Sequence, residues 1–154
     1  MKTTIQLAAA FALLASPALA AEKAPPTPIT IAPPPEGKGQ IVFFRRGGIG
    51  PLISCAVSEN GARVSRLPPG KYFVQVTTPG AHTYTVSSEA KDTLNVEVEA
   101  GETQYAKCNI RMGILAGRPN LAPSTKDEFD KGAGKLKLVE PQDDKDDDKK
   151  DDKK

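Results

Sequence analysis

Hydrophobic and polar residues alternate with a period of two through the middle of the chain. The alternation is clearest over residues 93–99, where Leu94, Val96 and Val98 alternate with polar residues. Successive side chains of a strand point to opposite faces, so this pattern predicts half-buried β-strands. The same period places four further sets on common faces: Ile53, Cys55 and Val57; Tyr72, Val74 and Val76; His82, Tyr84 and Val86; Ala106, Cys108, Ile110 and Met112.

One uninterrupted apolar segment and several turn motifs add to this prediction. Ile41-Val42-Phe43-Phe44 is apolar without alternation, which predicts a strand covered on both faces. Asn60-Gly61 separates two alternating runs and predicts a hairpin, because a type I′ turn needs positive φ at both central residues. Pro69-Gly70, Pro79-Gly80 and Ala100-Gly101 mark further turns.

Strands separated by turns at this spacing predict an all-β fold. We expect a small antiparallel β-sandwich of about 7–8 strands. Residues 124–131 depart from the pattern and predict one short helix near the C-terminus, with Ser124 as its N-cap and Gly132 after its end. A short final strand is expected at residues 135–139.

The first twenty residues have the features of a secretory signal peptide. Lys2 precedes an apolar stretch from Ile5 to Leu14, and Ala18-Leu19-Ala20 predicts cleavage between Ala20 and Ala21. The apolar stretch is shorter than the about 20 residues that span a bilayer, and an uncleaved N-terminal anchor is the alternative interpretation. We therefore expect a bacterial protein that is periplasmic or secreted, with no transmembrane span after cleavage.

Composition divides the remaining chain into three parts. Residues 21–36 form a proline-rich linker, since residues 24–35 hold six prolines in twelve positions. A ligand for a proline-recognising groove is the alternative for this segment. Residues 37–140 form the β-sandwich domain. Residues 143–154 contain no apolar side chain, and we expect residues 141–154 to form a disordered charged tail.

The net charge differs between the body and the tail. Residues 21–139 carry fifteen Lys and Arg against eleven Asp and Glu, a net +4, whereas residues 140–154 carry a net −3. A weakly basic body without a basic stripe is not typical of nucleic-acid-binding proteins. We expect no nucleic-acid partner, and an unknown envelope protein or glycan as the partner instead.

Ten residues form an ordered set of motifs: Leu67, Pro69, Gly70, Tyr72, Pro79, Gly80, His82, Ala100, Gly101 and Tyr105. This set resembles that of the bacterial envelope proteins grouped as domain of unknown function 2846. The likeness covers about residues 39–140. The resemblance implies a small exported β-sandwich, akin to carboxypeptidase-regulatory or transthyretin-like modules, and it implies no reaction. Many members look like lipoproteins, but this chain has no cysteine after the apolar stretch to carry the lipid.

Two cysteines are the first candidates for chemistry. Cys55 and Cys108 both lie on the apolar face of a predicted strand, and an even count in an exported domain predicts a disulfide. Buried free thiols are the alternative. A catalytic Cys–His pair needs an exposed thiol beside a base, and Cys55 lies mid-strand between Ile53 and Val57.

His82, Arg45 and Arg46 are the other candidates. His82 is in phase with Tyr84, so we expect it to pack on the sheet with a ring nitrogen bonded, and a functional role is the alternative. A zinc site needs three or four ligands, and one histidine without a Cys-x-x-Cys motif predicts no metal or cofactor. Arg45 and Arg46 begin a glycine-rich loop that matches no phosphate-loop pattern. Contact with an anion or a glycan is the alternative to a solvated loop.

These observations predict a non-catalytic module that binds a partner or supports the structure of the bacterial cell envelope. A glycan-binding or adhesion domain is one alternative, and it would need exposed aromatic side chains. An envelope hydrolase that uses His82 or a pair of carboxylates is the other.

Overall fold

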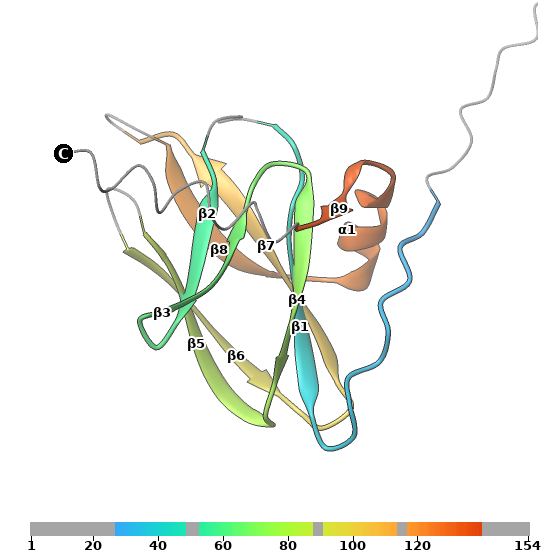
Figure 1. The fold of residues 1–154 in the computed structure, drawn as a ribbon. Helices are drawn as coiled ribbons and strands as arrows, with labels where there is room; N and C mark the ends of the chain where they lie inside the picture. The colour runs from blue at the N-terminus through green and yellow to red at the C-terminus, as the bar shows by residue number, and fades with distance from the viewer. Residues whose placement is uncertain (1–26, 49–52, 88–90, 114–116, 140–154) are drawn as a thin grey trace, which may run out of the picture.

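The computed structural model describes residues 27–48, 53–87, 91–113 and 117–139, and in them nine strands form two sheets (Figure 1). The predicted signal peptide, its cleavage site at Ala20 and Ala21, and the charged tail lie outside these residues. The prediction of an all-β sandwich is confirmed. The strands are β1 (Gly39–Arg45), β2 (Cys55–Glu59), β3 (Ala62–Leu67), β4 (Lys71–Thr77), β5 (Gly80–Ser87), β6 (Lys91–Val98), β7 (Thr103–Arg111), β8 (Arg118–Ser124) and β9 (Lys137–Leu138).

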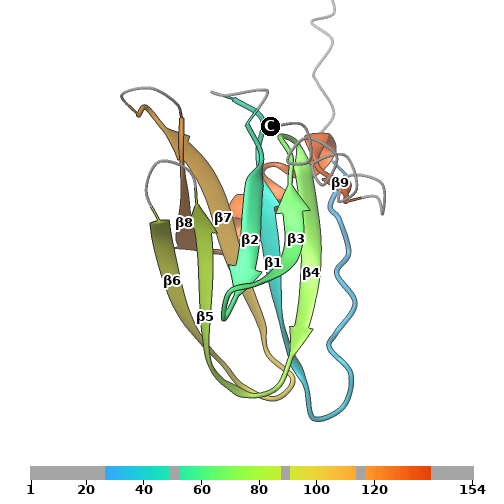
Figure 2. The ribbon, with the colours of Figure 1, turned by 60° about the vertical axis from the view of Figure 1, so that its left-hand side comes forward.

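The two sheets differ in how their strands pair. The four-stranded sheet has the order β3-β2-β5-β6 and is antiparallel throughout. The five-stranded sheet has the order β8-β7-β1-β4-β9, and here β1 runs parallel to β7 and β4 runs parallel to β9. Between β1 and β7 the chain contributes strands to both sheets before it returns to the five-stranded sheet. A connection of this length allows β1 and β7 to pair in parallel. Figure 2 shows the two sheets packed against each other.

The turns have two different roles. Asn60 and Gly61 have φ of 49° and 85° and join β2 to β3 in one sheet, so the predicted hairpin is confirmed. The turns at Pro69-Gly70, Pro79-Gly80 and Ala100-Gly101 instead carry the chain from one sheet to the other. The first two bracket β4, as the sequence indicates, but they close the sandwich at its ends and form no hairpins.

Strand β1 is buried on both faces, as predicted. Ile41 and Phe43 lie in the core between the sheets, whereas Val42 and Phe44 belong to a second apolar cluster on the outer face of the five-stranded sheet. The sandwich core also contains Cys55, Val57, Leu67, Phe73, Tyr84, Val86, Leu94, Val98, Ala106, Cys108 and Leu121. Met112, predicted to share a face with Ala106 and Cys108, lies beyond the end of β7 and is 81% exposed.

The second cluster is covered by two segments from outside the sandwich. Helix α1 (Lys126–Asp130) contributes Phe129, and a 3-10 turn at Ala133–Lys135 leads to Leu136. The proline-rich segment runs along the same side of the sheet, where Ile29 and Ile31 pack against the cluster (Figure 1). Tyr72 and Val74 of β4 also point to this outer cluster, and Val76 beyond them is 43% exposed.

A buried glutamine ties the proline-rich segment to the sheet. Gln40 is 3% exposed, and its amide nitrogen donates to the Ala32 carbonyl at 2.7 Å and to Thr103 Oγ1 at 2.9 Å. Both bonds satisfy a polar group that would be costly to bury alone. Residues expected to act only as a linker therefore also pack on the domain.

The predicted short helix is present, but its N-cap differs from the prediction. Ser124 is the last residue of β8, and Thr125 is the N-cap, its Oγ1 accepting from the Glu128 amide at 3.2 Å. Adjacent Ser and Thr are both good caps, and pairing of Ser124 with Tyr105 in the sheet moves the helix start by one residue. The predicted final strand is also present, as β9.

Strand β8 was not predicted, because its two prolines interrupt the alternating pattern. It is an edge strand, where proline is tolerated. The Leu121 amide points away from β7 and donates to Asp92 Oδ2 at 2.8 Å, so Pro119 and Pro123, two residues to either side, also present their backbone nitrogens to the open edge. Proline has no N–H to present at this edge, and Asp92 of β6 accepts from the one N–H that remains, that of Leu121. The edge is thus closed to further pairing.

Asp92 is expected to stabilise the sandwich by joining its two sheets. Asp92→Ala leaves the Leu121 amide without its acceptor and should lower the free energy of unfolding by about 1–3 kcal/mol. Asp92→Asn keeps an acceptor oxygen and should recover much of the loss. Urea denaturation of the three proteins measures this, and equal stability of the Ala variant and the wild type would contradict the assignment.

Candidate functional site

The two cysteines form a disulfide that joins the sheets. Cys55 of β2 and Cys108 of β7 are bonded Sγ to Sγ across a sequence separation of 53 residues, and both are buried. The predicted pairing is confirmed, and the alternative of buried free thiols is wrong. While this bond is intact, neither sulfur is available as a thiolate nucleophile.

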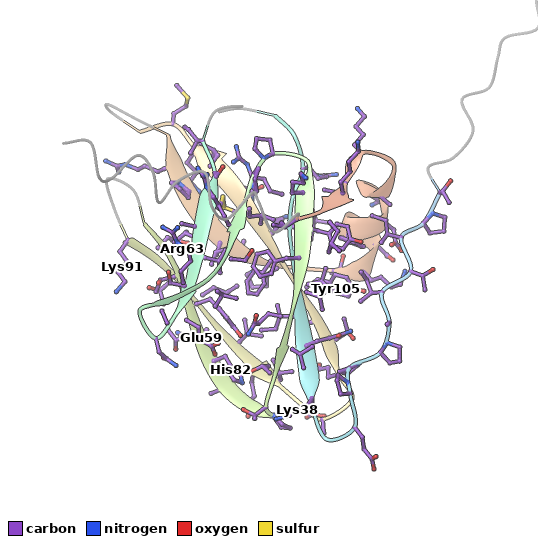
Figure 3. All side chains as sticks on the ribbon, viewed as in Figure 1. Lys38, Glu59, Arg63, His82, Lys91 and Tyr105 are labelled. Carbon is purple, nitrogen blue, oxygen red and sulfur yellow. A yellow bond between two sulfur atoms is a disulfide. The ribbon has the colours of Figure 1, made fainter. Side chains whose placement is uncertain are left out.

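His82 lies at the start of β5, with Glu59 of β2 beside it (Figure 3). Nδ1 is 2.6 Å from Glu59 Oε1, and Nε2 is 2.8 Å from the Thr78 carbonyl oxygen. Both partners are acceptors, so the geometry is satisfied when both ring nitrogens carry a proton and donate. The site therefore favours the protonated form of His82, an imidazolium, beside the carboxyl group of Glu59.

The ring of His82 packs on the sheet as predicted. It stacks on Tyr84 with centroids 6.2 Å apart, and its side chain is only 12% exposed. Glu59 was not a candidate from the sequence. It lies 23 residues away and has no recognisable motif beyond its place before the Asn60-Gly61 turn. The pair holds the tip of the β2–β3 hairpin against the crossing from β4 to β5.

A hydroxyl beside the ring gives the cluster the composition of a catalytic triad, but its geometry differs. Thr77 Oγ1 lies 3.1 Å from Nε2 and 3.2 Å from Nδ1, so it is in line with neither nitrogen. A general base needs a free lone pair aimed at the nucleophile's proton. Here Nε2 faces the Thr78 carbonyl and Nδ1 faces Glu59, and this arrangement suits a structural link.

The electrostatics of the cluster agree with this interpretation. Burial acts to lower the pKa of His82, but the bonds to the Thr78 carbonyl and to Glu59 outweigh it, and the pKa is raised above 6.5. Burial, followed by the charge of Glu59, also raises the pKa of Tyr84. The Tyr84 hydroxyl is fully buried and makes no hydrogen bond of good geometry.

Arg45 and Arg46 lie at the other end of the sandwich. Arg45 pairs with Lys71 at the start of β4, whereas Thr77 is the last residue of that strand and His82 follows in β5. Arg45 is 2% exposed and donates through Nη1 to the Ile53 carbonyl, while Arg46 is exposed. Residues 45–48 and residues 108–110 of β7 line a hollow of about 190 Å³. The structure does not bring these arginines and His82 together.

Three other expectations from the sequence concern a metal site, a glycan-binding surface and a membrane span. No group of three His, Cys, Asp or Glu in this part of the chain could hold a metal ion. None of its Tyr or Phe side chains is exposed enough to offer the stacking platform that a glycan-binding domain uses. Within the same residues, no helix has the length and apolar character needed to cross a membrane.

Removing the disulfide should destabilise the fold strongly. In the chain-entropy model, a bond across a separation of 53 residues stabilises by about 4 kcal/mol. We expect the double variant Cys55→Ala/Cys108→Ala to unfold at correspondingly lower urea, and reduced wild type to behave in the same way. Superimposable unfolding curves for oxidised and reduced wild type would show that the bond adds nothing.

The His82–Glu59 pair should make stability depend on pH. The pKa of His82 is higher in the folded state than the unfolded value of 6.5. Its contribution to the stability of the folded protein is therefore fully present below pH 6.5, and it is lost as the pH rises through the folded pKa. The difference in free energy of unfolding between wild type and His82→Gln should therefore shrink as the pH is raised from below 6.5 through the raised pKa of the folded state. A difference that stays constant over this range would contradict the protonated pair.

No known protein family, curated protein or solved structure matches this chain at a significant level. The resemblance to domain of unknown function 2846 therefore stays a prediction, and any functional proposal depends on the geometry described above.

Proposed function

We propose that this protein is an exported β-sandwich that acts as a non-catalytic binding or structural module of the bacterial cell envelope. The disulfide between Cys55 and Cys108 is the observation that carries the proposal. Disulfides persist in oxidising compartments such as the bacterial periplasm and are rare in the reducing cytosol. The predicted signal peptide, with cleavage between Ala20 and Ala21, supports the same compartment.

The arrangement of the candidate residues supports binding or structural support over catalysis. Both ring nitrogens of His82, the chain's single histidine, face acceptors, so the ring links two parts of the fold. The hollow at the opposite end is lined by residues 46–48, which follow β1, and by residues of β1 and β7, and loops carried on a sheet often hold binding residues.

Export is tested by expressing the full chain, and a variant without residues 1–20, in a bacterial host. We expect the full chain outside the cytoplasm, with the mass of residues 21–154 and no thiol that alkylates before reduction. The shortened variant should stay in the cytoplasm with both cysteines alkylated. Full chain found unprocessed in the cytoplasm with two free thiols would overturn the proposal.

The non-catalytic part of the proposal has a separate test. Purified protein should turn over no ester, peptide or glycoside substrate, and it should sediment with isolated envelope fragments but remain soluble alone. Turnover that is lost in His82→Ala and retained in the matched surface variant Thr83→Ala would show that the protein is an enzyme.

A further inference from the structure

The proline-rich segment is attached to the sheet more loosely than a strand. Residues 27–35, here called the arm, form no strand. Within the described residues, one hydrogen bond links the backbone of the arm to the sheet, from Gln40 Nε2 to the Ala32 carbonyl. Ile29 and Ile31 are half-buried and supply its packing on the second cluster. These contacts gain little over the entropy cost of ordering the arm, so it can leave the sheet more easily than a hydrogen-bonded strand.

A short turn joins the arm to β1 and can act as a hinge. The Lys38 amide donates to the Pro35 carbonyl at 3.0 Å, and Gly37 has a φ of 71°, so the chain reverses its direction here. Figure 1 shows the arm running down beside the sheet and turning back into β1. The Lys38 carbonyl accepts from the Gly101 amide at 2.8 Å, which holds the domain side of the turn in place. Rotation at the exposed residues Glu36 and Gly37 would therefore move the arm and leave the sheet intact.

The surface beneath the arm needs a cover of matching chemistry. Val42 and Phe44 are at most 1% exposed, and Tyr72, Val74 and Tyr105 beside them are half-buried. Exposing apolar side chains to water is unfavourable, so an arm that leaves must be replaced by an equivalent segment. The segment that the structure shows on this face is extended and has isoleucines at alternate positions before three prolines. A second copy of the chain carries an identical segment.

Two exposed apolar side chains lie on the same face of the sheet. Val76 is 43% exposed and lies opposite Gln40, the residue that binds the arm. Leu138 is 52% exposed and lies opposite Tyr72 of the second cluster. Directly paired residues of neighbouring strands share a face, so both side chains belong to the outer face. A second domain brought to this face would cover them.

We propose that two copies of this chain exchange their arms, so that residues 27–35 of each copy lie on the second cluster of the other. The proposal deepens the proposed structural role, on which it rests, by naming a second copy of the chain as the partner. Exchange replaces contacts within one chain by the same contacts between two chains. A proline-rich arm extends by about 3.1 Å per residue, which is enough to reach a neighbouring domain.

The oligomeric state of the purified protein tests the exchange. Light scattering after size-exclusion chromatography, from low micromolar to millimolar concentration, should show a monomer that converts to a dimer. Ile29→Ser/Ile31→Ser should raise the dissociation constant of the dimer about tenfold or more, because both apolar contacts of the arm are lost. The matched control Thr30→Ser, at the exposed residue between them, should dimerise like wild type.

A substitution in the hinge tests the exchange without altering the contact surface. Gly37→Ala strains the closed turn, because an L residue disfavours a φ of 71°, and no atom lies within 4 Å of the added Cβ. An exchanged arm does not need this angle, so the dissociation constant of the dimer should fall about tenfold. The matched control Gly47→Ala, where a Cβ has equal space and φ is not positive, should leave the constant unchanged.

A spin label locates the arm in the dimer. A nitroxide is attached to Thr30→Cys with the native disulfide intact, and this protein is mixed with isotope-labelled Ile29→Ser/Ile31→Ser protein. The amide signals of the second cluster, such as that of Val74, should broaden in the isotope-labelled copy, because the arm of the other copy lies on them. A nitroxide at Thr83→Cys, an exposed position in the other sheet, should leave these signals sharp.

Three outcomes would overturn the exchange: a monomer at every concentration, a dimer that the isoleucine variant does not weaken, and broadening away from the second cluster. A wild type that stays monomeric while a synthetic peptide of residues 24–36 binds the isoleucine variant would also overturn it, and would assign this face to an extended segment of another protein. Export and envelope binding are measured separately. A dimer with exchanged arms that is not exported would therefore leave the exchange standing and overturn the envelope role.

Discussion

The burial of β1 on both faces is the constraint on which the rest of this structure depends. Ile41 and Phe43 complete the core between the sheets, and Val42 and Phe44 point away from it. Burying such a side chain is worth about 1.5–3 kcal/mol, so neither face of the strand can be left to solvent. The helix with Phe129 and the segment with Ile29 and Ile31 are therefore parts of the fold.

A disulfide and a carboxylate join the two sheets at separate places, and a third contact lies at one end of the four-stranded sheet. The disulfide links β2 to β7, and Asp92 of β6 binds the edge of β8. His82 and Glu59 tie the hairpin tip to the crossing between sheets.

Much of the fold could be predicted from the sequence, but less of the candidate functional site could. The strand around Val42, the hairpin at Asn60-Gly61 and the helix near Phe129 follow from local patterns. Strand β8 could not be predicted, because Pro119 is acceptable only at a sheet edge, and pairing decides which strand is the edge. The partner of His82 could not be predicted either, because a period of two indicates a face and no neighbour.

The sequence by itself determined the positions of most strands, the short helix, the turns and the two-sided burial of β1. These depend on the period and the backbone angles of a few consecutive residues. Only the tertiary structure decided that the Pro-Gly turns cross between sheets, that β1 runs parallel to β7, and that Cys55 lies within bonding distance of Cys108. These pairings join residues that are remote in the sequence, and the distances between such residues are set by how the whole chain packs.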